Sequence, residues 1–515
     1  MAVQVRASAG CWAWKVLIWT MRSVTLVAYL WITHLLAHHR QSNPSSKPLL
    51  FWLFSCWMLL ECVYFPYWII TCQRLSARGR GTHACTVQAE RIIMIEKIIA
   101  ATKITATSDG STGEWFLRWF RPAHRSSPAF TIEDIRRDNL EEWIAWAAFD
   151  RTLECVNGCR VSAADCAQLA NLVEKILGRN FLPGRNAEIT SIRLTLDPIY
   201  ATHRPIVYYA AIEVLHALGT IGVSLLGYRR REINGQTFLY RGPLDASLSK
   251  QMAPIIFCHG LGIGFLHYLR VLMHLPSSVY LIESPNITMT LGAETQRSIA
   301  DTQALVSAML KADGHASACI VAHSFGTIIP SWLLNSKDEA VRALVESVVL
   351  VDPISLLLFD PTVAFNFVHR HPANSVEMMM SYFVSQELYI AHTLARCFSW
   401  SDAVLFLDDV PSHVRIQVLL SGADAIVPAR LVRAYVEQHR AQATAKGGGG
   451  GVDPPVWFEK VAHGELMLKE RYVAAITRAC EKGVQTSSGI LTTSDPESCV
   501  SPAAAATAKN NCHGS

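Results

Sequence analysis

Two long apolar runs dominate the first 72 residues of the chain. The first covers about residues 16–36 and is interrupted by Arg22, and the second covers residues 49–72, in which Glu61 is the only charged side chain. A helix needs about 20 residues to cross the hydrocarbon layer of a membrane. The polar linker between the runs is only long enough for a turn, so the pattern predicts a transmembrane hairpin within residues 1–80.

The residues that flank these runs bear on the alternatives. A cleaved signal peptide would have a short apolar core and a small-residue cleavage site, whereas here the first run is long and the basic sequence 38–40 follows it. A signal anchor followed by an interfacial helix stays open as a second alternative. The linker holds only two basic residues, Arg40 and Lys47, whereas three lie at the front of the chain (Arg6, Lys15 and Arg22) and four follow the second run (Arg74, Arg78, Arg80 and Arg91). The positive-inside rule therefore predicts that both ends of the hairpin lie in the cytosol.

A third apolar stretch, residues 206–227, lies within a largely helical linker region, 84–232. It contains Glu213 and His216, which are costly inside lipid. We interpret this stretch as a buried or membrane-surface helix packed on the C-terminal domain, with a third membrane span as the alternative. Upstream of it, residues 131–156 have the apolar spacing of an amphipathic helix, and core packing suffices to explain them.

From about residue 236 the pattern changes to short apolar strands that alternate with helix-length segments. Continuous apolar strands separated by helices predict an α/β fold, in which helices cover both faces of a mostly parallel sheet. The predicted strands are residues 235–241, 254–260, 278–284, 317–323, 346–352, 415–422 and 456–463.

One junction between a strand and a helix carries the strongest chemical signal. An apolar strand ends at Ala322, a His-Ser-Phe-Gly sequence follows, and a helix begins. This is the pattern of the nucleophile elbow, in which a sharp turn presents a serine hydroxyl, here that of Ser324, above the sheet. Ala322 and Gly326 are the small residues on either side, and alanine in place of the usual glycine is a sterically mild departure. We expect His323 to shape the elbow.

In such an elbow the acid and the histidine follow the serine in chain order. Asp424 lies just past the end of the penultimate strand, and His463 lies at the end of the last one. We expect His463 to take the proton of Ser324 and Asp424 to orient the imidazole. Asp352, which ends an earlier strand, is the alternative acid, although the G-x-D-x-x-V-P sequence at 422–428 favours Asp424.

A glycine-rich turn follows an early strand of the same region. Its His-Gly-Leu-Gly sequence can direct a backbone N–H at the oxyanion that develops during acyl transfer. We expect the N–H groups of Leu261 and Phe325 to be the two donors. His259 is expected to brace the turn, and Gly260 and Gly262 belong to the same motif.

These motifs give residues 236–482 a resemblance to the α/β-hydrolases of the large serine-hydrolase superfamily, over roughly half of the chain. The whole chain is similar to membrane-anchored, lipase-like hydrolases of fungi, algae and protists, in which a membrane segment and a helical linker precede this domain. The resemblance implies the α/β-hydrolase fold with a helical lid. Residues 354–414 are the expected lid, because they are too long for a simple crossover and rich in apolar side chains that would line an acyl-binding cleft.

Composition adds limits to this interpretation. Only 17% of the residues are charged, against about 25% in soluble domains, and the mean hydropathy of +0.22 favours membrane contact. The net charge of +4 is small, so nucleic acid is not an expected partner, and the basic excess lies in residues 1–110. Cys155, Cys159 and Cys166 have no histidine nearby at zinc-finger spacing and are interpreted as ordinary thiols. Residues 484–515 are expected to be disordered.

These observations predict a serine hydrolase that cleaves carboxylic esters, with lipid esters of the acylglycerol or phospholipid type as substrates. An acyltransferase that uses a lipid alcohol as acceptor, or a catalytically inactive membrane scaffold, would keep the same fold and stays an alternative. No cofactor or metal is expected. The expected location is an integral membrane protein whose catalytic domain faces the cytosol, at the endoplasmic reticulum or a lipid-droplet-associated membrane.

Overall fold

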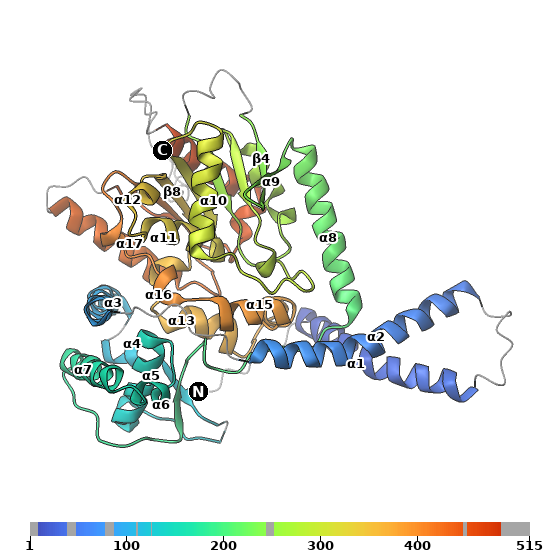
Figure 1. Cartoon of the computed structure of the whole chain (residues 1–515), viewed down its shortest axis with the longest axis horizontal. Helices are drawn as coiled ribbons and strands as arrows, with labels where there is room; N and C mark the ends of the chain where they lie inside the picture. Colours follow the sequence, from blue (N-terminus) through green and yellow to red (C-terminus); the bar gives the residue numbers. More distant parts are fainter. Residues whose placement is uncertain are drawn as a thin grey trace, which may run out of the picture.

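The computed structural model describes most of the chain, and Figure 1 shows a helical hairpin that projects from a larger body. The predicted disordered tail lies almost wholly outside the described residues, and so do residues 446–450, which hold four of the five consecutive glycines. The described residues are 9–38, 48–77, 87–109, 112–124, 126–243, 252–445 and 451–485.

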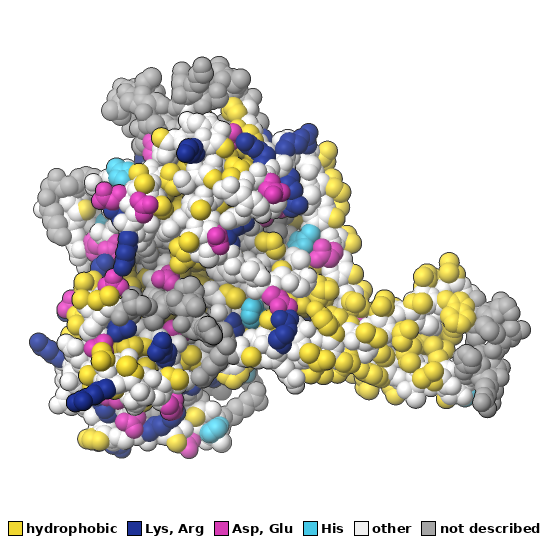
Figure 2. All heavy atoms as spheres, viewed as in Figure 1, with side chains coloured by type: hydrophobic (Ala, Val, Ile, Leu, Met, Phe, Trp, Pro, Cys, Tyr) yellow, Lys and Arg dark blue, Asp and Glu magenta, His cyan; other side chains and the backbone are white. Residues whose placement is uncertain are grey.

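Helices α1 (Ala9–His38) and α2 (Leu49–Ser76) form the projecting hairpin. The two helices pack side by side, and the Trp31 indole N–H donates to Ser55 Oγ at 3.1 Å. Among the described residues, both helices are long and apolar enough to cross a membrane, and so is a third, α8 (Ile206–Leu225). Figure 2 shows apolar side chains exposed along most of the hairpin, which is the surface expected of helices that contact lipid.

Helix α8 packs one face on the body and exposes the other. A Cβ on Gly222 would lie 2.5 Å from Leu269 Cδ1, so the helix packs closely on its neighbour at this glycine. Apolar side chains on the opposite face, Leu218 and Ile221 among them, are exposed. In Figure 1 the helix runs along the body and roughly across the direction of the hairpin. The sequence favours a helix packed on the body over a third membrane span, and α8 is long and apolar enough for either.

The region between the hairpin and α8 is mainly helical and packs below the sheet in Figure 1. The sequence predicts one amphipathic helix over residues 131–156, but the structure breaks it. Helix α5 ends at Phe149 because Asp150 adopts a left-handed conformation with φ of 50°, and Thr152 then caps the next helix. The elements are α3 (Gln88–Asp109), α4 (Thr112–Leu117), β1 (Phe120–Pro122), α5 (Arg137–Phe149), α6 (Leu153–Asn157), α7 (Arg160–Leu177) and β2 (Ile189–Ser191).

An eight-stranded sheet forms the centre of the C-terminal half. Its order is β10-β9-β8-β7-β5-β6-β4-β3, and all neighbours are parallel except β3–β4 and β4–β6. Strand β3 is not among the strands that the sequence predicts, and the last strand is shorter than predicted. The strands are β3 (Arg229–Ile233), β4 (Gln236–Arg241), β5 (Ile255–Cys258), β6 (Val279–Ile282), β7 (Ala318–His323), β8 (Val345–Val351), β9 (Arg415–Ser421) and β10 (Val456–Phe458).

Helices cover both faces of this sheet, and four short helices lie between β8 and β9, where the lid is expected. One face packs against α9 (Leu269–His274) and α18 (Glu470–Val484). The other face packs against α10 (Ile299–Ala312), α11 (Ile328–Leu334) and α17 (Ala429–Ala445). A short helix α12 (Glu339–Arg342) precedes β8. The lid helices are α13 (Pro361–Ala364), α14 (Ser375–Met380), α15 (Leu388–His392) and α16 (Trp400–Ala403). This layered, mostly parallel arrangement is the predicted α/β-hydrolase fold, which is confirmed.

Candidate active site

A strained turn lies between the end of β7 and the start of α11. Ser324 adopts a φ of 53°, which is strained for a residue with a side chain. A Cβ on Gly326 would lie 2.4 Å from the carbonyl oxygen of Cys258 and 2.6 Å from that of His259, so no larger residue fits there. Strain of this kind places the serine hydroxyl at the carboxyl edge of the sheet, as the elbow pattern predicts.

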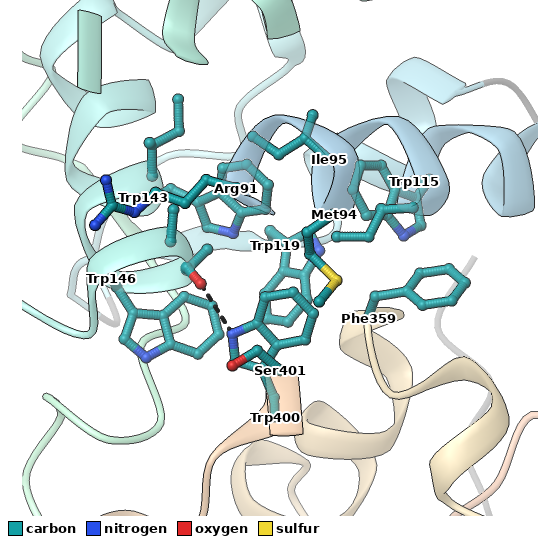
Figure 3. Close-up of a pocket in the computed structure, with 14 residues that line it drawn as sticks. Arg91, Met94, Ile95, Trp115, Trp119, Trp143, Trp146, Phe359, Trp400 and Ser401 are labelled. Atoms are coloured by element: carbon teal, nitrogen blue, oxygen red, sulfur yellow. Dashed lines mark hydrogen bonds between the residues drawn. The ribbon is translucent and has the colours of Figure 1, made fainter. Parts of the chain in front are cut away.

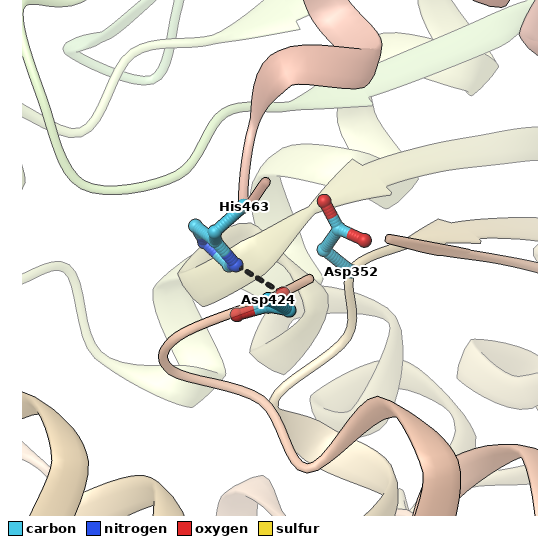
Figure 4. Close-up of side chains that lie close together, drawn as sticks. All are labelled: Asp352, Asp424 and His463. Atoms are coloured by element: carbon cyan, nitrogen blue, oxygen red, sulfur yellow. Dashed lines mark hydrogen bonds and ion pairs between the residues drawn. The ribbon is translucent and has the colours of Figure 1, made fainter. Parts of the chain in front are cut away.

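The structure brings together the serine, histidine and acid that the sequence singles out. His463 Nε2 lies 2.8 Å from Ser324 Oγ, and His463 Nδ1 lies 2.6 Å from Asp424 Oδ2. The three residues come from the loops that follow β7, β9 and β10, all at one edge of the sheet. With a proton on Nδ1, the imidazole donates to Asp424 and can accept the hydroxyl proton of Ser324. Figure 4 shows the contact between His463 and Asp424.

The carboxylate of Asp424 is held in place by its own loop. Its Oδ1 accepts the backbone N–H groups of Ile426 at 2.7 Å and Val427 at 2.9 Å, which leaves Oδ2 for the imidazole. The side chain of Asp424 is wholly buried. A carboxylate fixed by two N–H donors and shielded from water can orient the imidazole without moving itself.

Asp352, the alternative acid, has a different set of partners. Its Oδ1 accepts the Ser421 N–H at 2.8 Å, and its Oδ2 accepts the Ser421 hydroxyl at 2.9 Å and the Gly464 N–H at 3.1 Å. In Figure 4 it lies beside the pair formed by His463 and Asp424. Potential ligand atoms of these three groups lie within 4.8 Å of one another. The 2.6 Å contact between two of them leaves no room for a metal ion there, so the arrangement fits a hydrogen-bond network.

Burial and nearby charges have opposite effects on the pKa of His463. Burial opposes the charged imidazolium of His463, but the negative charges of Asp424 and Asp352 outweigh it and raise the pKa of His463 to about 9. Burial raises the pKa of Asp352 to about 6, and His463 and the hydrogen bonds to the carboxylate limit that rise. The protonated histidine that forms when the serine reacts is therefore strongly favoured by its surroundings.

The glycine-rich turn lies directly opposite the elbow. The Gly260 N–H donates to the hydroxyl of Tyr268 at 2.9 Å, and the Gly262 N–H donates to the carbonyl of Ile287 at 3.1 Å. Within the described residues, the N–H of Leu261, which lies between these two glycines in the sequence, takes part in neither hydrogen bond. Leu261 and Phe325 line the same cavity as Ser324, and their N–H groups stay the predicted oxyanion donors.

Two buried histidines brace these turns. His259 Nδ1 donates to the carbonyl of Gly260 at 2.9 Å, and its Nε2 accepts the N–H of Ser284 at 3.2 Å. The hydroxyl of Tyr268 donates to His323 Nδ1 at 2.8 Å, which ties the glycine-rich turn to the elbow. Burial lowers the pKa of His259 to about 4 and that of His323 further, so both stay neutral. Tyr268 is a residue that sequence reasoning missed, because a lone tyrosine gives no local signal.

Ser324 opens into a cavity with an empty volume of about 750 Å³. Lid side chains such as Phe367 and Leu394 line it, as the apolar lid sequence predicts. Trp119 and Trp146, from the helical linker region, line it as well. No sequence signal assigned the linker to the site, since Trp146 sits in a helix whose amphipathic pattern core packing already explains and Trp119 lies in the turn after α4.

Comparison with known proteins finds solved structures of low similarity. No family model matches the chain, and no curated protein matches it. An esterase from the fungus Rhizomucor miehei is similar over 55% of this chain and 91% of its own, at 15% identity and a TM-score of 0.37. An esterase from the archaeon Pyrobaculum calidifontis is similar over 55% and 92%, at 13% identity and a TM-score of 0.37. A carboxylesterase from Bacillus subtilis is similar over 54% and 99%, at 12% identity and a TM-score of 0.34.

The strand order and the elbow of the chain itself are those of the α/β-hydrolase fold. At such low identity the substrates of these solved proteins do not transfer to it. Its chemistry follows from the serine, histidine and aspartate described above and from the cavity that they face.

Proposed function

We propose that the chain is a serine hydrolase that cleaves carboxylic esters through an acyl-enzyme. The observation that carries this proposal is the continuous hydrogen-bond relay from Ser324 through His463 to Asp424. Ser324 Oγ attacks the ester carbonyl carbon while its proton passes to His463 Nε2. The N–H groups of Leu261 and Phe325 hold the oxyanion of the tetrahedral intermediate. That intermediate collapses, His463 gives its proton to the departing alcohol, and water then releases the acid by the same steps in reverse.

The cavity and its surroundings support a lipid ester of the acylglycerol or phospholipid type as the substrate. The cavity beside Ser324 is lined almost entirely by apolar side chains. The lid that encloses it rests on the base of the hairpin, where Trp14 meets Phe383 edge-on at 6.0 Å and the Arg22 guanidinium lies 5.5 Å from the Tyr382 ring centre. An ester drawn from a bilayer would thus reach the serine next to the segment that anchors the protein.

The placement of the apolar helices supports a membrane-anchored enzyme. If α1 and α2 enter the bilayer, α8 lies near its surface, because it runs across the direction of the hairpin with its outer face apolar. This is the geometry of an amphipathic interfacial helix, although a more apolar one than usual. With both ends of the hairpin on the cytosolic side, the sheet and lid face the cytosol, at the endoplasmic reticulum or a lipid-droplet-associated membrane.

The direct test is release of fatty acid by the purified full chain in mixed micelles of acylglycerol or phospholipid. Wild type should release acid, and Ser324→Ala should abolish the activity. Ser331→Ala is the matched control, because this buried serine lies on the next helix and donates only to the Thr327 carbonyl in the described structure. Equal activity in wild type and Ser324→Ala would overturn the proposal.

Acyl transfer to a lipid alcohol is the second candidate. The apolar lining that favours a lipid ester also favours a lipid alcohol over water as the acyl acceptor. Both reactions share the acyl-enzyme on Ser324, so only the products separate them. Adding a monoacylglycerol to the same assay would yield a new ester if transfer is the main reaction, and only free acid if hydrolysis is.

A further inference from the structure

A second cavity lies behind the first, between the helical linker region and the lid. Its volume is about 570 Å³ when the space open to solvent is counted, and Figure 3 shows the tryptophan side chains that surround it. Helices α3, α4 and α5 supply one side, and Phe359 and the start of α16 supply the other. The reaction proposed above does not involve this cavity.

The two cavities share three wall residues, Trp119, Trp146 and Trp400. Each of these residues supplies atoms to the lining of both cavities. The two spaces therefore adjoin at these side chains. The second cavity therefore extends the space beside Ser324 towards the helical linker region.

Two of the three tryptophans are fixed by hydrogen bonds and one is not. The Trp146 indole N–H donates to Thr195 Oγ1 at 2.9 Å, and the Trp400 indole N–H donates to the Ala147 carbonyl at 3.1 Å. The buried indole N–H of Trp119 has no hydrogen-bond partner within the described residues. Its ring is held by contacts with neighbouring indoles, such as that of Trp146 at 5.3 Å. Trp119 is thus the wall residue that can turn at the lowest cost.

The lining of the second cavity indicates what it can hold. Its one charged side chain, Arg91, bonds Asp165 at 3.1 Å, and its guanidinium lies 4.1 Å from the Phe149 ring centre, so its charge is already engaged. The rest of the lining is apolar apart from the indole N–H groups and Ser401. Such a space suits a hydrocarbon chain, since each buried methylene strengthens binding by about fourfold, and it offers no counter-charge for a headgroup.

We propose that the second cavity binds the distal part of the substrate's acyl chain, which passes Trp119 after leaving the cavity of Ser324. This inference rests on the proposed function and adds the substrate class to it, namely esters of long-chain acids. It also gives the helical linker region a role, because residues of α3 and α5 then set the chain length that the enzyme accepts. Short-chain esters fill only the first cavity and do not reach these residues.

A photoreactive probe tests this placement directly. An alkyl fluorophosphonate with a diazirine at the end of a hexadecyl chain reacts with the nucleophile and then, on illumination, with whatever lies at the chain end. In the full chain we expect an adduct on Ser324 and a crosslink within residues 91–98 or 143–148 other than Trp146, which lines both cavities, whereas a butyl analogue should crosslink only residues of the first cavity. An adduct on Ser324 with the hexadecyl crosslink on the lid surface or the hairpin would overturn the inference alone. Absence of the Ser324 adduct would overturn the proposed function as well.

Filling the second cavity gives an independent test. Ala148 lines this cavity and not the first. Ala148→Phe should therefore leave kcat/KM for a butyryl ester within about twofold of wild type. It should lower kcat/KM for a palmitoyl ester by at least about tenfold, because two or more methylenes of the acyl chain would no longer be buried. Ala164→Phe, at an exposed position of α7 that lines neither cavity, is the matched control. An unchanged ratio of palmitoyl to butyryl activity in the folded Ala148→Phe protein would contradict the inference.

Discussion

The carboxylate of Asp352 accepts the backbone N–H of Gly464 at 3.1 Å, one residue after His463. The same carboxylate binds Ser421 through two hydrogen bonds, so it joins the end of β9 to the loop that carries the histidine. Within the described structure Asp352 forms no hydrogen bond to the imidazole of His463, because the carboxylate of Asp424 accepts that hydrogen bond. Asp352 therefore acts as a positioning residue that also contributes negative charge behind the proposed catalytic histidine.

The first prediction concerns this charge and the pH dependence of the reaction. The base form of His463 is needed to accept the serine proton, and the two carboxylates raise the pKa of that histidine. Activity should therefore rise with pH and reach its plateau on the alkaline side. Asp352→Asn removes one negative charge, lowers the pKa of His463 and should move the midpoint of the kcat/KM profile to lower pH.

The control for this prediction separates charge from structure. Asparagine cannot accept all three hydrogen bonds of Asp352, and a buried N–H left without an acceptor costs about 1–3 kcal/mol. A lower Tm alone would be the outcome of a purely structural role. An Asp352→Asn profile with an unchanged or alkaline-shifted midpoint would contradict the electrostatic account.

Asp424 should matter far more than Asp352 for the rate. Asparagine at this position would present an N–H to the imidazole and favour the wrong tautomer of His463. The same change in serine proteases lowers kcat on the order of 10⁴-fold, and we expect a loss of that size here. Asp408→Asn, at an exposed position, serves as the control and should be neutral. Steady-state kinetics on one soluble ester suffices, and a larger loss from Asp352→Asn than from Asp424→Asn would reverse the assignment of the acid.

The elbow should not tolerate a side chain at Gly326. The nearest atoms to an added Cβ are backbone carbonyl oxygens, which cannot move aside as a side chain can. We expect Gly326→Ala to lower the free energy of unfolding by about 3 kcal/mol or more. Gly242→Ala is the matched control, because a Cβ there meets nothing within 4 Å and φ is not positive, and it should change stability by less than about 0.5 kcal/mol. Similar denaturation midpoints for the two variants would show that the turn is looser than described.

The outer face of α8 should contact lipid while the helix stays on the membrane surface. Ile221→Lys should lower hydrolysis of a vesicle-borne ester by about tenfold, since it replaces lipid-facing apolar surface with a charge, and leave hydrolysis of a soluble ester unchanged. Thr220→Lys adds the same charge outside the apolar stripe and should have little effect. Equal losses from both lysines would favour a helix surrounded by lipid, as a third membrane span would be.

The parts of the fold that the sequence predicts well are those with a local cause. The elbow at Ser324 is visible because a strand, two small residues and a helix follow one another within a few positions. Asp424 and His463 follow from chain order, and the structure places both within hydrogen-bond reach of their partners. Each of these signals reflects a requirement of backbone geometry at one place in the chain.

The parts that the sequence does not predict depend on contacts between distant segments. Strand β3 follows a long apolar helix and begins with three arginines, a pattern typical of residues that flank a membrane span. The signal for a strand is the turn at Asn234 and Gly235, which joins β3 and β4 as a hairpin. The contribution of Trp119 to the cavity of Ser324 depends on how the helical region docks below the lid. No periodicity in residues 84–232 could have indicated that docking.

The measurement that tests the central claim most directly is covalent labelling of the full chain in membranes by a fluorophosphonate probe. If Ser324 is the activated nucleophile, wild type and Ser331→Ala should be labelled, Ser324→Ala should not, and mass spectrometry should find the adduct on Ser324. Lipid or detergent should restore labelling if the lid alone blocks the probe. Labelling that persists in Ser324→Ala, or wild type that stays unlabelled with lipid present while a control hydrolase reacts, would contradict the account.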